Sequence, residues 1–305
     1  FKTSSQFLIM DKQILDQYIR AGKIASEVRK ESKKMITVGA PLLDIAEKIE
    51  ALIKKKGALL AFPVNISIND AAAHYTPTAQ DKTIIKDNDI IKIDIGTHID
   101  GYVGDTAYTI SLNPEHESLV KASEQALEEA IKLCTPGTLL SDISEKIEET
   151  IKSFNLKPIA NLTGHGLDQY DLHADPQVPN IGFSSSYKIE ENQIIAIEPF
   201  ATDGAGLVKE SPESMIFRIT TIKPTRNMDA RKIIEWSEQF QGLPFAERWL
   251  NVLKFSEFKL KLALRELRNI EVLHEYPVLK EMKGGMISQA EHTIIIKEKP
   301  IVTTL

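Results

Sequence analysis

The sequence predicts an α+β fold in which helices cover the outer face of a curved, mainly antiparallel sheet. Two observations carry this prediction. A helix-like segment recurs once along the chain, and each copy is followed by runs rich in β-branched residues that read as strands. The inner face of such a sheet forms a concave cleft, and a cleft of this kind suits ligand binding.

The recurring segment is "GAPLLDIAEKIEALIKK", from Gly39, which matches "GTLLSDISEKIEETIKS", from Gly137. Apolar residues in both copies fall at helical spacing, so each copy is predicted to be an amphipathic helix. Each follows a second helix-like segment, residues 11–34 in one case and 115–133 in the other. The chain therefore consists of two similar halves, unless the match is a chance likeness between amphipathic helices.

The likeness continues into the strands that follow. "NDIIKIDIG", residues 88–96, pairs with "NQIIAIEPF", residues 192–200, and this pairing aligns Asp94 with Glu198. Packing of the two halves about a pseudo-twofold axis would bring both acidic side chains toward one central site.

The stretch "IIKIDIGTHIDGYVGDTAYTI", residues 90–110, predicts a β-hairpin with a two-residue turn at Asp100-Gly101. This turn sets Gly96 opposite Asp105 and puts Asp94 on the same face, diagonal to Asp105. Two ionised carboxylates so close together need either a shared proton or a cation between them, and a metal ion fits best. In a different register, one of the two would be a solvated edge residue.

Composition excludes several classes of protein. The 305 residues are 42% hydrophobic and 26% charged, as in ordinary globular chains of one or two domains. A net charge of −6 argues against a membrane-surface protein or one that mainly binds nucleic acid. No apolar run approaches the roughly 20 residues that span a bilayer. Residues 1–9 are expected to be an extension ahead of a natural start at Met10.

A single cysteine, Cys134, rules out an intrachain disulfide and favours a reducing, cytoplasmic compartment. It falls inside a helical pattern, so we expect a small buried side chain there rather than a reactive thiol.

Further candidate metal ligands occur along the second half. His165 lies between two glycines in "NLTGHGLDQYDLH", Glu198 ends the apolar run "IIAIEPF", and Glu291 opens a strand in "SQAEHTIII". With Asp94 and Asp105 they provide four carboxylates and one imidazole, a set that suits a pair of divalent cations. A structural zinc site would instead be dominated by Cys and His. Paired metals of this kind serve many hydrolases.

Two more histidines occupy equivalent places in the two halves. His74, in "NDAAAHYTP", and His173, in "YDLHADP", follow the opening glycines of the repeat by 35 and 36 residues. They are candidates for moving a proton or donating a hydrogen bond to a developing oxyanion, although each alone could be a surface loop residue. The other histidines have no comparable context: His98, His116, His274 and His292.

Taken together, "KIDIGTHIDGYVGDTAYTI", "GHG", "IEPF", "AEHT" and "AHYTP" resemble the methionine aminopeptidases, whose pita-bread fold carries a dinuclear metal cluster. The resemblance extends from about Lys12 to the C-terminus. It implies an enzyme that removes the initiator methionine of nascent polypeptides through attack of a metal-bridging water on the first peptide bond. The ribosome is a candidate place for this reaction. It also implies two divalent ions (Co, Mn, Fe or Zn) and a monomer that binds neither membrane nor nucleic acid.

The resemblance assigns a role to each ligand. Asp94 corresponds to the chelating ligand of one metal, and Asp105 and Glu291 correspond to the bridging carboxylates. His165 and Glu198 correspond to the remaining ligands of the other metal, and Glu198 also accepts a proton from the nucleophilic water.

It assigns roles around the substrate as well. His74 would contact the leaving-group side of the peptide, and His173 the scissile carbonyl or tetrahedral intermediate. Phe62, in "AFPVN", and Tyr276, in "EYPVL", would line the methionine pocket, the alternative being plain core packing.

The number of residues between Glu198 and Glu291 is similar to that in the type II, archaeal-like enzymes. These enzymes have a helical subdomain inserted between the corresponding residues. Residues 205–272 are expected to form that winged-helix-like insertion from three helices: "TRNMDARKIIEWSEQF", "PFAERWLNVL" and "FSEFKLKLALRELRN". Residues 10–204 and 273–305 would then form the catalytic domain.

Two alternatives share the fold. One is a proline-specific peptidase, and the other is a non-catalytic interaction protein that has lost its metal ligands. The presence of all five ligand types argues against the second. Metal content after dialysis distinguishes the two kinds of protein: an enzyme should retain at least one ion, and a non-catalytic interaction protein should retain none.

Overall fold

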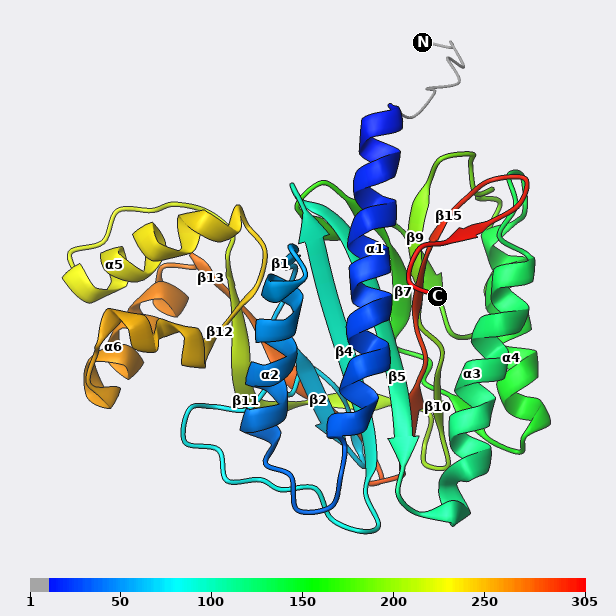
Figure 1. The fold of residues 1–305 in the computed structure, drawn as a ribbon, viewed down its shortest axis with the longest axis horizontal. Coiled ribbons are helices and arrows are strands. Elements are labelled where there is room, and N and C mark those ends of the chain that lie inside the picture. Colours follow the sequence, from blue (N-terminus) through cyan, green and yellow to red (C-terminus); the bar gives the residue numbers. More distant parts are fainter. Residues whose placement is uncertain (1–10) are drawn as a thin grey trace.

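A computed structural model describes residues 11–305, and it confirms the predicted α+β architecture (Figure 1). Curved antiparallel sheets form the centre, and helices pack outside them. The expectation for residues 1–9 and for a start at Met10 lies outside the described residues.

The described part of the first half contains two α-helices, one 3₁₀ helix and five strands, four of which form one sheet. Its elements are α1 (Lys12–Ser32), η1 (Lys33–Met35), α2 (Leu42–Lys55), β1 (Leu59–Leu60), β2 (Asn65–Ile68), β3 (Ala71–Ala73), β4 (Ile90–Ile99) and β5 (Tyr102–Ser111). Strands β1, β2 and β5 all pair with β4, while β3 joins another sheet. Helix α1 packs across β4 and β5 on their outer side (Figure 1).

The second half repeats this plan. Its elements are η2 (Pro114–His116), α3 (Glu117–Lys132), α4 (Leu140–Ser153), β6 (Lys157–Pro158), β7 (Thr163–Asp168), β8 (Asp171–Pro179), β9 (Ile194–Ile197) and β10 (Phe200–Thr202). Helices α3 and α4 pack against each other and cover the other end of the molecule (Figure 1).

The predicted duplication is confirmed in the backbone. Helices α2 and α4 are equally long, and the loop before each one begins at a glycine with a left-handed backbone, φ +84° at Gly39 and +88° at Gly137. Gly39 donates its N–H to Ile85 O and Gly137 donates to Ile189 O, both at 2.8 Å. Each loop thus makes the same contact with the strand region of its own half.

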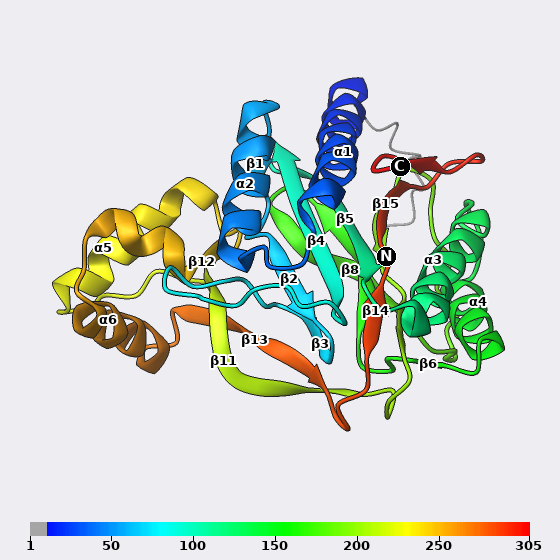
Figure 2. The ribbon, with the colours of Figure 1, turned by 60° about the horizontal axis from the view of Figure 1, so that its bottom comes forward.

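The last part of the chain adds strands and a helical region. Its elements are β11 (Val208–Ile219), α5 (Met228–Ser237), η3 (Glu238–Phe240), β12 (Phe245–Ala246), η4 (Glu247–Leu253), α6 (Glu257–Asn269), β13 (Leu273–Glu281), β14 (Ile287–Gln289), β15 (His292–Ile295) and β16 (Ile301–Val302). Figure 2 shows α5 and α6 grouped beside β11 and β13, at the far end of the molecule from α3 and α4.

The predicted hairpin register is confirmed. Gly96 lies opposite Asp105, and Asp94 lies opposite Ala107, one step along the same face. The turn has the positive φ angles that a type I′ turn requires at Asp100-Gly101, +51° and +86°. The alternative register, with one aspartate on a solvated edge, is therefore wrong.

Within residues 205–272 the structure differs from three successive helices. The first 12-residue element there is strand β11, which pairs with β13. The middle segment forms the short strand β12 and the 3₁₀ helix η4 instead of an α-helix, because Phe245 pairs with Phe217 in the sheet and is fully buried. Arg248 of η4 forms a buried ion pair with Glu50 of α2. The division into a catalytic domain and an insertion stays a prediction.

Two smaller expectations concern burial and length. Cys134 is fully buried just after α3, as predicted. Among residues 11–305, no helix combines the length and apolar character needed to cross a bilayer.

Candidate metal centre

The hairpin β4–β5 is fastened to the segment that leads into β15. Thr106 Oγ1 donates to Glu291 O at 2.8 Å, and Glu291 N donates to Ala107 O at 3.0 Å. Thr293 Oγ1 accepts from Asp105 N at 2.8 Å and donates to Asp105 O at 2.9 Å. These bonds fix the backbones of Asp105 and Glu291 side by side, so both carboxylates enter the same cavity.

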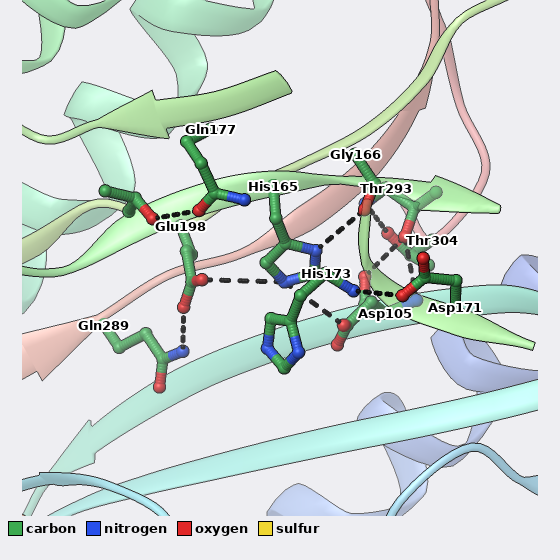
Figure 3. A network of polar contacts seen from close by, with 11 residues as sticks. Asp105, His165, Gly166, Asp171, His173, Gln177, Glu198, Gln289, Thr293 and Thr304 are labelled. Atoms are coloured by element: carbon green, nitrogen blue, oxygen red, sulfur yellow. Dashed lines mark hydrogen bonds and ion pairs between the residues drawn. The ribbon is translucent and has the colours of Figure 1, made fainter. Parts of the chain in front are cut away.

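The imidazole of His165 lies between two carboxylates (Figure 3). Its Nε2 is 3.9 Å from Asp105 Oδ2 and 3.7 Å from Glu198 Oε1. The other ring nitrogen, Nδ1, is 3.2 Å from Gly166 O, which can only accept a hydrogen bond. Nδ1 therefore carries the proton, and the lone pair of Nε2 faces the carboxylates, as in a metal-ligating histidine.

Strand pairing brings the second half to this point. His165 on β7 lies opposite Ala196 on β9, and Glu198 follows the end of β9 directly. Gln289 Nε2 donates to Glu198 Oε2 at 3.2 Å and so orients that carboxylate (Figure 3). Gln289 was not singled out in the sequence, because nothing in "SQAEHTIII" marks its amide as different from any other strand residue.

Burial raises the pKa of all four carboxyl groups. The pKa of Asp94 rises to about 7, and burial raises those of Asp105, Glu198 and Glu291 well above the ordinary range, with the neighbouring carboxylates adding to the rise. Among the described residues, Oδ1 of Asp94 and Oδ1 of Asp105 are buried without a hydrogen-bond partner. Four acids and two orphaned oxygens in one cavity indicate a place for a cation.

The nearest lysine in sequence does not supply that charge. Lys92, on β4, is buried and directs its ammonium to two backbone oxygens, Asn69 O at 2.8 Å and Ile287 O at 3.0 Å. By contrast, ligand atoms of Asp105, His165 and Glu291 all lie within 4.8 Å of one another. The donor set of carboxylates and one neutral imidazole fits a divalent metal ion.

His74 and His173 lie beside this cluster. The rings of His165 and His173 are 4.8 Å apart, and His173 stacks on Tyr276 at 6.1 Å. His74 meets Tyr276 edge-on at 5.5 Å, and its Nδ1 lies 3.1 Å from Pro277 O. Burial lowers the pKa of His74 to about 4 and that of His173 to about 3, so both rings are neutral at pH 7 and each carries one N–H, which His74 donates from Nδ1 to Pro277 O.

His74 also has an unusual backbone. Its φ of +67° lies in the left-handed region, which a non-glycine residue seldom adopts without support from its surroundings. The contacts with Tyr276 and Pro277 provide that support and aim the ring into the cavity.

One cavity brings together all nine residues singled out in the sequence. They are Phe62, His74, Asp94, Asp105, His165, His173, Glu198, Tyr276 and Glu291. Five more residues complete the lining: Asn65, Ala73, Leu172, Ile216 and Pro244. Sequence patterns do not mark these five, because they are ordinary strand or loop residues until the sheets fold over one another.

Phe62 reaches the cavity because Gly96 has no side chain. A Cβ built on Gly96 would lie 2.2 Å from Cε1 of Phe62, so the ring rests directly on the backbone of β4. The absence of a side chain at Gly96, opposite Asp105, thus lets Phe62 pack on β4 and form an aromatic wall beside the candidate metal ligands.

A duplicated α+β fold with a carboxylate-rich cluster, two neutral histidines and an adjoining apolar wall defines the class of metal-dependent hydrolases. Comparison with known proteins narrows this class, since metallopeptidase family M24 matches residues 16–228. The chain belongs to metallopeptidase family M24 and, within it, to the methionine aminopeptidases of archaeal type.

The curated relatives are similar along nearly their whole length. A methionine aminopeptidase of Thermococcus onnurineus is 45% identical over 289 residues, which cover 94% of this chain and 98% of that protein. A methionine aminopeptidase of Methanocaldococcus jannaschii is 43% identical over 296 residues, covering 97% and 99%.

Solved structures confirm the pita-bread fold. A thermophilic Arx1 superposes with a TM-score of 0.84 at 20% identity, covering 96% of this chain and 90% of that one. Methionine aminopeptidase from Thermotoga maritima gives 0.71 at 22%, covering 96% and 97%. Prolidase from Pyrococcus furiosus gives 0.62 at 18%, covering 96% and 64%. At identities this low, these structural similarities support the fold alone.

Proposed function

We propose that the chain removes the N-terminal methionine from peptides and nascent proteins as a metal-dependent aminopeptidase. The observation that carries this proposal is the single cavity that holds four carboxylates and His165 next to an apolar wall. The similarity to curated methionine aminopeptidases over nearly the whole chain supports the same function.

We further propose that the cluster holds two divalent ions. Asp94 would chelate one ion, His165 and Glu198 would bind the other, and Asp105 and Glu291 would bridge them. The orphaned oxygens of Asp94 and Asp105 support this assignment. When bound, such ions lower the pKa of water and polarise a carbonyl oxygen. Mn, Fe, Co and Zn all accept this donor set.

The protein's own groups move the protons. Glu198 would accept a proton from the attacking water, and the amide of Gln289 holds its carboxylate in place through Oε2. His173, neutral at pH 7, would donate a hydrogen bond to the oxyanion that develops on the scissile carbonyl. The single N–H of neutral His74 is donated from Nδ1 to Pro277 O, so its Nε2 would face the leaving-group side and accept a hydrogen bond there.

The apolar part of the cavity would receive the methionine side chain. Phe62 and Tyr276 present aromatic rings, and a thioether packs well against aromatic edges. Leu172, Ile216 and Pro244 supply the remaining apolar surface.

Several wider properties are part of the same proposal. The substrates would be nascent polypeptides that begin with methionine, and the enzyme would encounter them at the ribosome. It would act as a monomer in the cytoplasm. Neither a membrane nor a nucleic acid is expected as a partner, in keeping with the net charge of −6. Residues 205–272 would correspond to the type II insertion, with α5 and α6 as its helices.

The test is peptide hydrolysis by metal-free protein to which each metal is added separately. Met-Ala-Ser should be cleaved after Met, whereas Ala-Pro should not be cleaved. Preference for Ala-Pro or Met-Pro over Met-Ala-Ser would favour a proline-specific peptidase instead. A folded protein that retains no metal after dialysis and cleaves none of the peptides would contradict the enzymatic function.

A further inference from the structure

A second cavity, of about 620 Å³, adjoins the one that holds the cluster, and His173 and Tyr276 line both. It is wider and more polar than the inner cavity, and Tyr170, Asp171, Arg218 and His274 contribute to its lining. A peptide whose first residue fills the inner cavity can continue past the shared residues into the second cavity.

Strands β11 and β13 form one continuous wall for both cavities. The cross-strand pair Ile216 and Tyr276 lines the inner cavity. The next pair on the same face, Arg218 and His274, lines the outer cavity. Residues two apart on a strand are separated by about 6.6 Å, roughly the length of two residues of extended peptide. The wall therefore changes from Ile216 and Tyr276 to the charged Arg218 over a distance of about two residues of extended peptide.

The intervening pair faces the other way and confirms these directions. Phe217 is fully buried among the helices, and Arg268 of α6 lies over its ring at 5.7 Å. Glu275, opposite Phe217, accepts from Arg268 Nε at 2.7 Å. The ionic contacts of α6 thus fall on the far face of the sheet and leave Arg218 to the cavity.

The guanidinium of Arg218 makes no hydrogen bond and no ion pair with any residue in the described range 11–305, and its Nε is buried without a partner. Burial is the main cause of the lowered pKa of His173 and His274, and the positive charge of Arg218 lowers both further. The one carboxylate in the outer lining, Asp171, accepts instead from His173 N at 3.3 Å. A partly buried cation without an ion-pair partner is unfavourable, and an incoming anion would relieve it.

We infer that the outer cavity is the subsite for the peptide that follows the scissile bond, and that Arg218 binds a carboxylate carried by that peptide. The carboxylate can be an acidic side chain at the second or third substrate residue, or the C-terminal carboxylate of a short peptide. This inference rests on the proposed removal of N-terminal methionine. A planar guanidinium can hold such a group through two parallel hydrogen bonds.

The test compares peptides that differ only in one charge. One series consists of Met-Ala-Xaa-Gly amides with Glu, Gln or Lys as Xaa, and a second series has the variable residue in second position. These two series test whether Arg218 binds an acidic side chain of the substrate. Met-Ala-Ser as free acid and as amide measures the C-terminal source. We expect KM to be about 10-fold lower for the favoured acidic peptide than for its neutral counterpart, with kcat little changed, because the contact is made with bound substrate.

Arg218→Met should abolish this preference while neutral peptides are still processed, and Arg218→Lys should keep part of it as a point charge. Arg265→Met is the matched control, since it removes the same charge from the exposed side of α6 and should preserve the preference. Calorimetry measures binding of the product Ala-Glu-Gly amide without any dependence on turnover. Arg218→Met should weaken this binding.

Equal KM values for acidic and neutral peptides in both side-chain series and for the acid and amide forms of Met-Ala-Ser, or a preference that survives in Arg218→Met, would overturn the subsite while leaving methionine removal intact. Failure of wild-type protein to cleave any Met peptide with any of the metals would overturn the proposed function, and the subsite with it.

Discussion

Asp105 Oδ2 and His165 Nε2 lie 3.9 Å apart, too far for a hydrogen bond and close enough for both atoms to bind one ion. The distance arises from two separate sheets, since Asp105 is on β5 and His165 is on β7. Thr293 holds the backbone of Asp105, and Gly166 O holds the ring of His165. This gap between two buried groups, with Oδ1 of Asp105 also left without a partner, is the physical reason to expect metal at the centre.

Asp105→Asn should lower metal occupancy and nearly abolish methionine removal, because it deletes a charge proposed to be shared by two ions while keeping the size of the side chain. Metal content of dialysed protein and peptide turnover are the measurements. Asp142→Asn, on the exposed side of α4, is the control and should match wild type. Unchanged metal stoichiometry in a folded Asp105→Asn variant would contradict the bridging role.

The two histidines should behave differently from the ligands. His74→Ala and His173→Ala should keep the metal and lose on the order of 100-fold in kcat, because each removes a hydrogen bond proposed for the transition state. His116→Ala, in η2, is the matched substitution outside the cavity and should turn over normally. Metal loss from either variant would make that histidine a ligand, and wild-type rates would remove its catalytic role.

The stability of the metal-free protein should fall as pH rises. The carboxyl group of Asp94 has a pKa of about 7 in the folded chain, against about 3.9 when unfolded. Between these values the folded state binds a proton that the unfolded state has lost, so its stabilising effect is complete below about pH 4 and is lost as pH approaches 7. The raised pKa values of Asp105, Glu198 and Glu291 act in the same direction.

Metal should reverse this trend, because it binds the ionised carboxylates. At 100 times its Kd, an ion adds about 2.7 kcal/mol to the free energy of unfolding, so melting temperatures should rise more with Mn²⁺ at pH 7.5 than at pH 5. The comparison with Asp94→Asn isolates the contribution of this site from that of other acids. An equal rise at both pH values would show that the cluster does not take up the metal as carboxylate.

Much of the centre could be predicted because its signals are local or repeated. The Asp100-Gly101 turn fixes the register that puts Asp94 near Asp105, and the duplication aligns Asp94 with Glu198. The outer cavity could not be predicted in this way. Arg218 meets His274 only through the pairing of two strands separated by the helical segment, and no local pattern specifies that pairing.

The middle helix expected in residues 205–272 is a case in which a local pattern predicted the wrong element. "PFAERWLNVL" has helical spacing, yet Phe245 is drawn into the sheet opposite Phe217, and Arg248 pairs with Glu50 of α2. Both partners lie far away in the sequence. Tertiary contacts therefore override a moderate local propensity, and a 3₁₀ helix results.

The pocket for the first substrate residue should select methionine. Phe62 and Tyr276 line the inner cavity together with the cluster, so a free N-terminal methionine should enter side chain first. A misfit of about one methylene costs roughly 1–3 kcal/mol, or about 10- to 200-fold in specificity, so leucine should be removed much more slowly than methionine. An acetylated methionine carries extra bulk at the amine and should resist cleavage.

Gly96→Ala probes the same pocket from behind. The new Cβ would lie 2.2 Å from the ring of Phe62, so the ring must move and the pocket must change shape. We expect kcat/KM for Met peptides to fall and discrimination against leucine to weaken, while metal content stays at the wild-type level because no ligand is altered. Competition between Met-Ala-Ser and Leu-Ala-Ser measures both effects in one experiment. Efficient removal of leucine by wild-type protein, or equal cleavage of acetylated peptides, would rule out a closed methionine pocket and leave a broad-specificity aminopeptidase on the same cluster.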